Sequence, residues 1–368
     1  MHTHMTLARS SPPVPPPAVA PQARPVPRLF VLLTLCLILS MFIGVSLGSL
    51  NIAPRTVATV LAAHLVPAGW IDTSSVSEAD LVVVWLIRTP RVLVAALVGA
   101  ALALAGAQMQ GLFHNPLASP DLIGTSAGAA FGAVLAIACG LAARSLWYLP
   151  LLAFLSALGA LFAVYAIATQ RGRTPVATLL LAGVALTALI GAATSLVISL
   201  QFANYQVAQE IVFWLMGGLD SRTWIHVGMV APCVGLGALI ACSVMRELDV
   251  LLLGEEAAAS LGVPVESIKR TVLTSVALLT GAAVAVSGVI GFVGLVVPHM
   301  VRLVIGPAHR RLLPASTLVG ASFVILADVL ARMLLRPEEL RLGMITAAFG
   351  APFFLYLLLT RQRDTALS

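Results

Sequence analysis

The chain has 368 residues, of which 60% are hydrophobic and only 10% are charged, with a formal net charge of +6. Soluble domains carry roughly 25% charged residues, so this chain has too few to cover a water-facing surface. We therefore expect an all-α polytopic membrane protein surrounded by lipid. The positive charge does not indicate nucleic-acid binding, because the basic residues are scattered between apolar runs and form no basic face.

Residues 1–28 differ from the rest of the chain in their high content of proline. This composition predicts a disordered or extended tail. The apolar run that follows is too long for a secretory signal and lacks a clean cleavage site. We therefore expect the tail to remain on the protein and to lie in the cytoplasm.

Ten apolar segments are candidates for transmembrane helices, which need about 20 residues each. They are 29–49, 91–111, 121–141, 146–169, 175–200, 224–245, 271–289, 291–308, 314–335 and 342–361. Ten crossings place both termini on one side, and the larger share of the basic residues is cytoplasmic when that side is inside. The sequence therefore predicts a transmembrane domain over 29–361 and a cytoplasmic C-terminal tail over 362–368.

Three connections are longer than simple links: 50–90 and 201–222 outside, and 246–270 inside. The inner connection contains a short helix with Glu255 and Glu256, closed by a glycine and a proline. Such a helix is typical of a segment that inserts into a groove of a partner protein. An ordinary helix at the membrane interface is the alternative.

The chain contains an internal repeat. GAALALAG at 99–106 is similar to GAAVAVSG at 281–288, and Pro116 and Pro298 follow at the same distance. A true duplication would make two five-helix halves of inverted orientation, with the two prolines as matched helix breaks near the transport path. A proline also leaves a carbonyl of its own helix without a donor. The alternative is that two apolar helices are similar by composition alone.

Several classes of chemistry lack the residues that they need. The chain has one lysine, Lys269, which Arg270 follows, so there is no Walker A motif. Asp328 is the only acid well inside a predicted helix, and Arg332 lies one turn away, which predicts an ion pair. Proton-coupled carriers need intramembrane carboxylates, so a secondary carrier or channel is the weaker alternative. An intramembrane enzyme is weaker still, because no paired aspartates or zinc motif is present.

Several long motifs occur in order along residues 30–361. They are IRTPRVLVAALVGAALALAGAQMQGLFHNPLASPDLIGTSAGA (87–129), LLLAGVAL (179–186), LLLGEEAAASLGVP (251–264), GFVGLVVPHMVRLVIGPAHRRLLPAS (291–316) and ADVLAR (327–332). In these motifs the chain resembles the permease subunits of bacterial binding-protein-dependent ABC importers for ferric siderophores, heme and cobalamin. The stretch 111–137 is most similar to heme permeases.

The resemblance implies a type II ABC importer permease fold in the bacterial inner membrane. It implies a homodimer that binds two ATPase subunits below and a periplasmic substrate-binding protein above. The permease itself would be no enzyme and would hold no cofactor stably, since ATP and magnesium are used by the partner ATPase. Heme is the expected substrate, imported by alternating access, with cobalamin or a ferric siderophore as alternatives.

The resemblance also implies roles for individual residues. The segment that contacts the ATPase would comprise Gly254, Glu255, Glu256, Ala257, Ala258, Ser260, Leu261 and Gly262. Arg88, Arg91 and Arg332 would receive carboxylates of the binding protein, because an arginine offers a rigid, charged fork. Internal ion pairs or lipid headgroups are the alternative partners. The cytoplasmic gate would include Val176, Ala177 and Thr178, which are less rich in hydroxyl groups than in some relatives.

Overall fold

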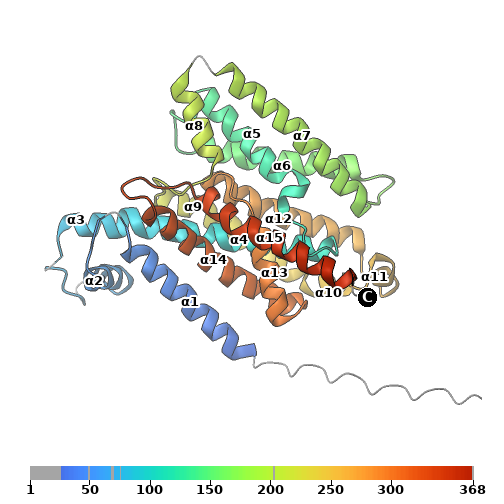
Figure 1. Ribbon diagram of the computed structural model, residues 1–368, viewed down its shortest axis with the longest axis horizontal. Coiled ribbons are helices and arrows are strands. Elements are labelled where there is room, and N and C mark those ends of the chain that lie inside the picture. Colours follow the sequence, from blue (N-terminus) through green and yellow to red (C-terminus); the bar gives the residue numbers. More distant parts are fainter. Residues whose placement is uncertain (1–25, 49, 68–69, 75, 202–203, 367–368) are drawn as a thin grey trace, which may run out of the picture.

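A computed structural model describes residues 26–48, 50–67, 70–74, 76–201 and 204–366, and the regular elements of this part of the chain are helices. Each of the ten expected transmembrane segments overlaps one of them (Figure 1). These ten are α1 Val26–Ser46, α4 Thr89–Leu112, α5 Thr125–Ala138, α6 Tyr148–Ala168, α7 Val176–Leu200, α9 Trp224–Ser243, α12 Val265–Ser287, α13 Val293–Ile305, α14 His309–Met333 and α15 Leu342–Ala366. The all-α fold is therefore confirmed.

The shorter elements lie in the connections between these helices. They are α2 Pro54–Leu65, α3 Glu78–Leu81, the π-helical η1 Val82–Arg88, the 3-10 helix η2 Pro120–Ile123, α8 Tyr205–Leu215, α10 Met245–Leu251 and α11 Glu255–Ser260. Within the described residues, seven helices are long and apolar enough to cross a membrane. The apolar stretches of α5, α13 and α15 are shorter.

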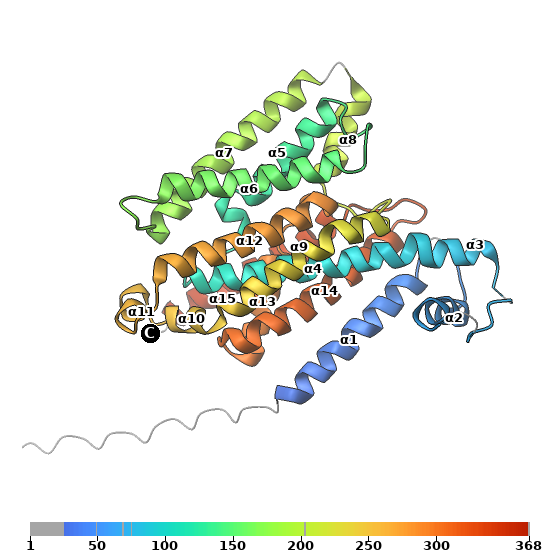
Figure 2. The ribbon, with the colours of Figure 1, turned by 180° about the vertical axis from the view of Figure 1, so that it is seen from behind.

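Helix α4 lies at the centre of the bundle. It packs against α14, α12, α13 and α9. In the continuous helical span Glu78–Leu112 that includes α4, 83% of the most apolar stretch is buried. Helices α5, α6 and α7 form a layer beside it that contacts α12, and Figure 2 shows this layer from behind. The most apolar stretch of α1 is only 17% buried, so α1 is a peripheral helix.

The two segments of the internal repeat lie in α4 and α12, which pack against each other. The N-terminal end of α4 adjoins η1, whereas the N-terminal end of α12 lies beside α11 at the other end of the bundle (Figure 1). The two helices therefore run in opposite directions, as an inverted repeat requires.

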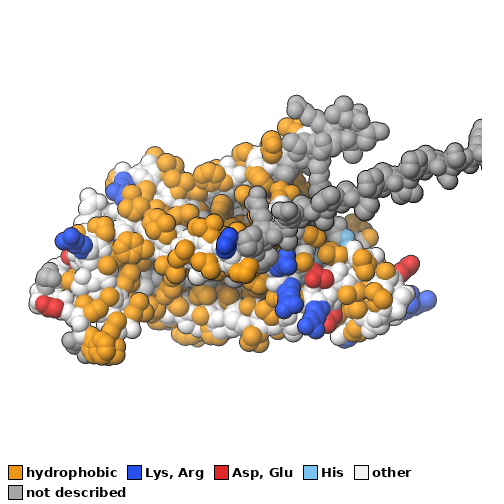
Figure 3. All heavy atoms as spheres, turned by 90° about the horizontal axis from the view of Figure 1, so that it is seen from below, with side chains coloured by type: hydrophobic (Ala, Val, Ile, Leu, Met, Phe, Trp, Pro, Cys, Tyr) orange, Lys and Arg blue, Asp and Glu red, His pale blue; other side chains and the backbone are white. Residues whose placement is uncertain are grey.

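The outward-facing sides of the helices are apolar. Figure 3 shows hydrophobic side chains over most of one face of the molecule. Leu35 and Leu39 on α1, and Leu181 and Leu189 on α7, are more than half exposed in the single chain. An exposed apolar surface of this kind is the one that lipid or another apolar protein surface covers.

Several boundaries differ from the sequence prediction. α1 begins at Val26, inside the predicted tail, and α15 continues to Ala366, beyond the predicted end at 361. The rest of the N-terminal tail prediction lies outside the described residues. The second transmembrane helix is also longer, because α3 and η1 lead directly into α4. Pro90 offers no N–H there, and the Trp85 carbonyl, five residues before it in the π-helical segment, accepts instead from the indole N–H of Trp224 at 2.9 Å.

The prolines of the repeat are not equivalent breaks. Pro116 lies in the non-helical connection between α4 and η2, four residues after α4 has ended at Leu112. The prediction for Pro298 is wrong, because this residue lies inside α13. The interruption occurs earlier, where Gly288 and Phe292 both have positive φ values between α12 and α13. Those two residues, rather than the proline, redirect the chain.

Helices α4 and α13 make a close contact at the carbonyl that Pro298 leaves without its helical donor. A proline in a helix leaves the carbonyl four residues before it without a donor, and here that residue is Gly294. A Cβ atom built on Gly106 would lie 1.7 Å from the Gly294 carbonyl oxygen. Only glycine at 106 therefore lets α4 cover this carbonyl, and the neighbouring Leu295 carbonyl accepts a hydrogen bond from Gln110 at 3.0 Å.

We expect Gly106→Ala to destabilise the fold by about 1–3 kcal/mol, because the added methyl group forces α4 and α13 apart. The matched control is Gly159→Ala in α6, where an added Cβ meets nothing within 4 Å. Thermal unfolding of the purified variants in detergent measures the difference. Equal melting temperatures for both variants would contradict the proposed packing.

Candidate functional site

The three arginines predicted to contact a binding protein come together in space. Arg88 lies at the end of η1, Arg91 in the first turn of α4 and Arg332 in the last turn of α14. All three line one cavity of about 180 Å³, together with Glu339. We call Arg88, Arg91, Arg332 and Asp328 the arginine cluster.

Asp328 is the centre of this cluster. It is 1% exposed and lies between two guanidinium groups. Its carboxylate accepts from Arg91 Nη2 at 2.9 Å and from Arg332 Nε at 3.0 Å. The Asp328–Arg332 pair expected from the sequence is thus confirmed, and Arg91 is an additional partner.

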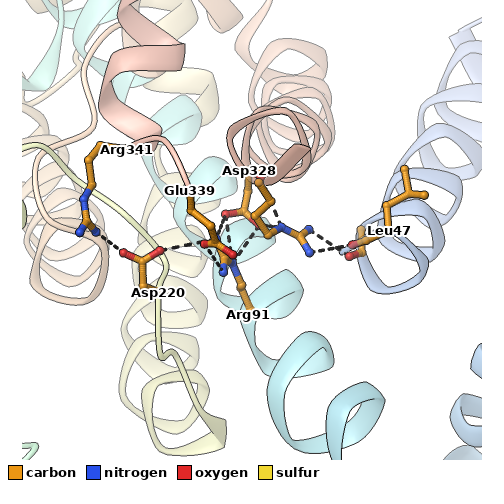
Figure 4. A network of polar contacts seen from close by, with 8 residues as sticks. Leu47, Arg91, Asp220, Asp328, Glu339 and Arg341 are labelled. Atoms are coloured by element: carbon orange, nitrogen blue, oxygen red, sulfur yellow. Dashed lines mark hydrogen bonds and ion pairs between the residues drawn. The ribbon is translucent and has the colours of Figure 1, made fainter. Parts of the chain in front are cut away.

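Further acidic groups extend the network towards α8. Arg91 Nη1 lies 2.9 Å from a carboxylate oxygen of Glu339, and Arg91 Nη2 lies 3.7 Å from one of Asp220. Asp220 also pairs with Arg341, as Figure 4 shows. The Arg341 guanidinium lies 4.5 Å from the centre of the Phe213 ring, a cation–π contact.

The sequence prediction missed Asp220, Glu339 and Arg341. One signal was available, because all three lie in predicted outer segments, as do Arg88 and Arg91. Beside them is a cavity of about 530 Å³. It is lined by Gln206, Gln209, Glu210, Phe213, Trp214, Gly218, Asp220, Ser221, Arg222, Ser287 and Arg341.

Arg88 and Arg332 also bind the C-terminal end of α1. Arg88 donates to the carbonyls of Val45 at 3.0 Å and Ser46 at 2.8 Å, and Arg332 donates to that of Leu47 at 2.8 Å. The last carbonyls of a helix lack intrahelical donors, and a cation there is favourable. The two arginines therefore cap α1 from the two helices beside it.

The docking role of these arginines stays a prediction. Arg88 is 5% exposed and Arg332 is 4% exposed, and both have partners within the chain. The side chain of Arg91 is 12% exposed. A carboxylate from another protein would therefore reach them through the cavity that they share.

The predicted ATPase-contacting segment forms α11 at the opposite end of the bundle. Gly254 and Gly262 flank this helix with φ values of +104° and +84°, a conformation that favours glycine. Ala258 is buried, while Glu256, Ala257, Ser260 and Leu261 face outwards. Helix α11 therefore rests on the protein through one side and presents the other.

Lys269, in the first turns of α12, links α11 to the rest of the protein. Its ammonium group donates to Glu255 at 2.7 Å, to Glu266 at 3.2 Å and to the Thr174 carbonyl at 2.8 Å. Glu266 accepts in addition from the Thr174 backbone N–H at 3.2 Å. We call Lys269, Glu255, Glu266 and Thr174 the lysine junction.

The predicted gate residues lie next to this junction. Val176, Ala177 and Thr178 form the first turn of α7, directly after Thr174 and Pro175. Ala177 is exposed in the single chain, and the other two are half-buried. Their role as a gate stays a prediction.

Among the described residues, no group of three or more histidine, cysteine, aspartate or glutamate side chains is placed to hold a metal ion.

Residues 35–360 match the model of the FecCD transport family. The chain belongs to this family. It is 48% identical over 287 residues to the cobalamin import system permease of Halobacterium salinarum, covering 78% of this chain and 76% of that one. It is 41% identical over 351 residues to the hemin transport system permease of Yersinia pestis, covering 92% and 97%.

A solved structure of a metal-chelate type ABC transporter in an inward-facing conformation is similar to this FecCD chain throughout. The TM-score is 0.79 at 33% sequence identity, covering 91% of this chain and 99% of the other. The FecCD chain thus has the type II ABC importer permease fold. It is a permease of the class of importers that carry metal chelates, cobalamin or heme.

We expect Asp328→Asn to destabilise the protein strongly, since it leaves Arg91 and Arg332 buried with reduced charge compensation. Breaking a buried pair by removing one partner typically costs about 3–5 kcal/mol. Glu338→Gln, at an exposed acid near the same end, is the control. Thermal unfolding in detergent compares them, and an unchanged melting temperature for Asp328→Asn would exclude the central role of this carboxylate.

Proposed function

We propose that the chain is the membrane subunit of an ATP-driven importer that moves heme from the periplasm to the cytoplasm by alternating access. Helix α11 carries this proposal. It is a short helix that is flanked by two glycines, rests on Ala258 and presents Glu256 and Leu261 outwards. An ATPase subunit can bind such a helix in a groove on its surface, whereas a carrier driven by an ion gradient needs no such contact.

The partners follow from this role. We propose a homodimer with the transport path on its twofold axis, two ATPase subunits at the α11 end and a periplasmic binding protein at the arginine-cluster end. ATP and magnesium would be used by the ATPase. The chain would lie in a bacterial inner membrane with both termini in the cytoplasm, in agreement with the distribution of basic residues in the sequence.

The arginine cluster supports the position of the binding protein. Charged groups at an interface steer association and fix orientation more than they add affinity. Three guanidinium groups around one cavity offer such a target to carboxylates, and Glu339 competes for Arg91 inside the chain. Docking would thus exchange one carboxylate partner for another rather than create new charge pairs.

Two substrates have specific support. The match to the hemin permease extends over nearly the whole of both chains, which favours heme. The match to the cobalamin permease is shorter but has the higher identity, which favours cobalamin as the second candidate. Both substrates are large, rigid, metal-bearing and partly apolar.

Uptake by reconstituted vesicles tests the proposal. They contain this chain with the ATPase and binding protein encoded beside it. Heme, cobalamin and a ferric siderophore are offered in parallel, with and without ATP in the compartment that holds the ATPase. We expect ATP-dependent uptake of heme. Selective uptake of another chelate would replace the substrate, and uptake without ATP would refute the proposed mechanism.

We expect Glu256→Arg to reduce co-purification of the ATPase at least tenfold and to abolish uptake, because it reverses a charge on the exposed side of α11. Glu256 has no part in the lysine junction, so the change leaves that contact intact. Glu338→Arg, a charge reversal at the opposite end, is the control. Normal ATPase binding by Glu256→Arg would show that α11 is not the contact.

A further inference from the structure

Lys269 is the only lysine in the chain and is 2% exposed. Its three N–H donors face three acceptors, each on a different segment. Glu255 belongs to α11, Glu266 to the first turn of α12, and Thr174 to the connection between α6 and α7. A single ammonium group thus joins the predicted ATPase-contacting helix α11 to the segment that precedes the predicted gate.

We propose that Lys269 is a positioning residue that transmits movement of α11 to the beginning of α7. The proposal rests on the function proposed above, and it assigns to a residue outside the exposed side of α11 the task of coupling ATP hydrolysis to the gate.

The burial of the ammonium group makes the link tight. A buried charge that loses a hydrogen-bond acceptor is strongly disfavoured, since water cannot replace the acceptor. If the ATPase displaces α11, the Glu255 carboxylate moves with it, and the least costly response of Lys269 is to follow. The carbonyl of Thr174 is then drawn along, because it accepts from the same nitrogen at 2.8 Å.

The connection to α7 is stiff as well. Both backbone groups of Thr174 are held, the carbonyl by Lys269 and the N–H by Glu266 at 3.2 Å. Thr174 is 1% exposed. Pro175 follows, which fixes its own φ and restricts the residue before it to extended conformations. A shift of Thr174 is therefore passed to Val176 and α7 with little loss in the backbone between them.

A substitution that removes the ammonium group while keeping the length of the side chain tests this role. In vesicles with the complete complex, we expect Lys269→Met to keep ATP hydrolysis within about twofold of wild type and to lower substrate uptake about tenfold. The quantity that decides is the amount of substrate moved per ATP hydrolysed. A merely structural role would lower hydrolysis and uptake in proportion, and that result would overturn the proposal, as would unchanged uptake.

Two variants serve as controls. Arg270→Met removes the neighbouring basic side chain, which is exposed, and should leave the ratio unchanged. Glu255→Gln weakens one arm of the junction at a half-exposed position and should lower the ratio even if Lys269→Met fails to fold. The double variant should be no worse than Lys269→Met alone, because both changes interrupt the same link; additive losses would contradict this.

A second measurement does not depend on the substrate. Cysteines replace Ala259 on α11 and Arg173 beside Thr174 in separate chains whose four native cysteines are changed to serine, and each carries a fluorescent probe. When a non-hydrolysable ATP analogue is added to the complex, both probes should respond in the Lys269 chain. In Lys269→Met, only the probe at 259 should respond, and a full response at 173 would overturn the proposal. If wild type moves no chelate, the proposed function fails, while these probes still decide the role of Lys269.

Discussion

The structure depends on the carboxylate of Asp328, which is buried between two guanidinium groups. A charge that is buried in the protein is shielded from water, so each buried charged group needs partners within the protein. Asp328 meets this need for Arg91 and Arg332 together, and thereby joins α4 to α14. Arg332 uses its remaining donors on the end of α1. A helix with little buried surface of its own is thus attached through its backbone carbonyls.

The centre of the bundle depends on the smallest residue. Helices α4 and α13 approach closely only because Gly106 has no side chain, and this approach covers the carbonyl that Pro298 leaves without a donor. Gly99 and Gly320 make a similar contact between α4 and α14. Without a hydrophobic force between helices in lipid, such backbone approach is a main source of association. The repeated glycines therefore explain why α4 can contact so many neighbours.

The number and order of the long helices could be predicted, because lipid requires runs of apolar residues that hydropathy detects. Their ends could not be predicted. The second helix continues through Pro90, where the Trp85 carbonyl accepts from the Trp224 indole, and Pro298 lies inside α13 against Gly106. No local pattern contains these contacts between distant segments. For the candidate site, the IRTPR and ADVLAR motifs indicated Arg88, Arg91 and Arg332. They did not indicate that these side chains are largely buried and bind groups within the chain. Charged residues carry no sequence signal for burial when their partners, such as Asp220 and Glu339, lie in other segments. In the sequence, Lys269 showed only that the chain has no Walker A motif, and nothing indicated its contacts with Glu255 and Thr174.

The two polar clusters use different cations, and this difference has a mechanical meaning. A guanidinium group is a planar fork whose hydrogen bonds fix the angle as well as the distance between the groups that it joins. An ammonium group is a compact charge on a flexible stem, whose three donors rotate freely. The arginine cluster therefore holds α1, α4 and α14 in one fixed relative orientation. The contact made by Lys269 is different. It keeps α11 and the connection before α7 attached to each other while allowing the angle between them to change.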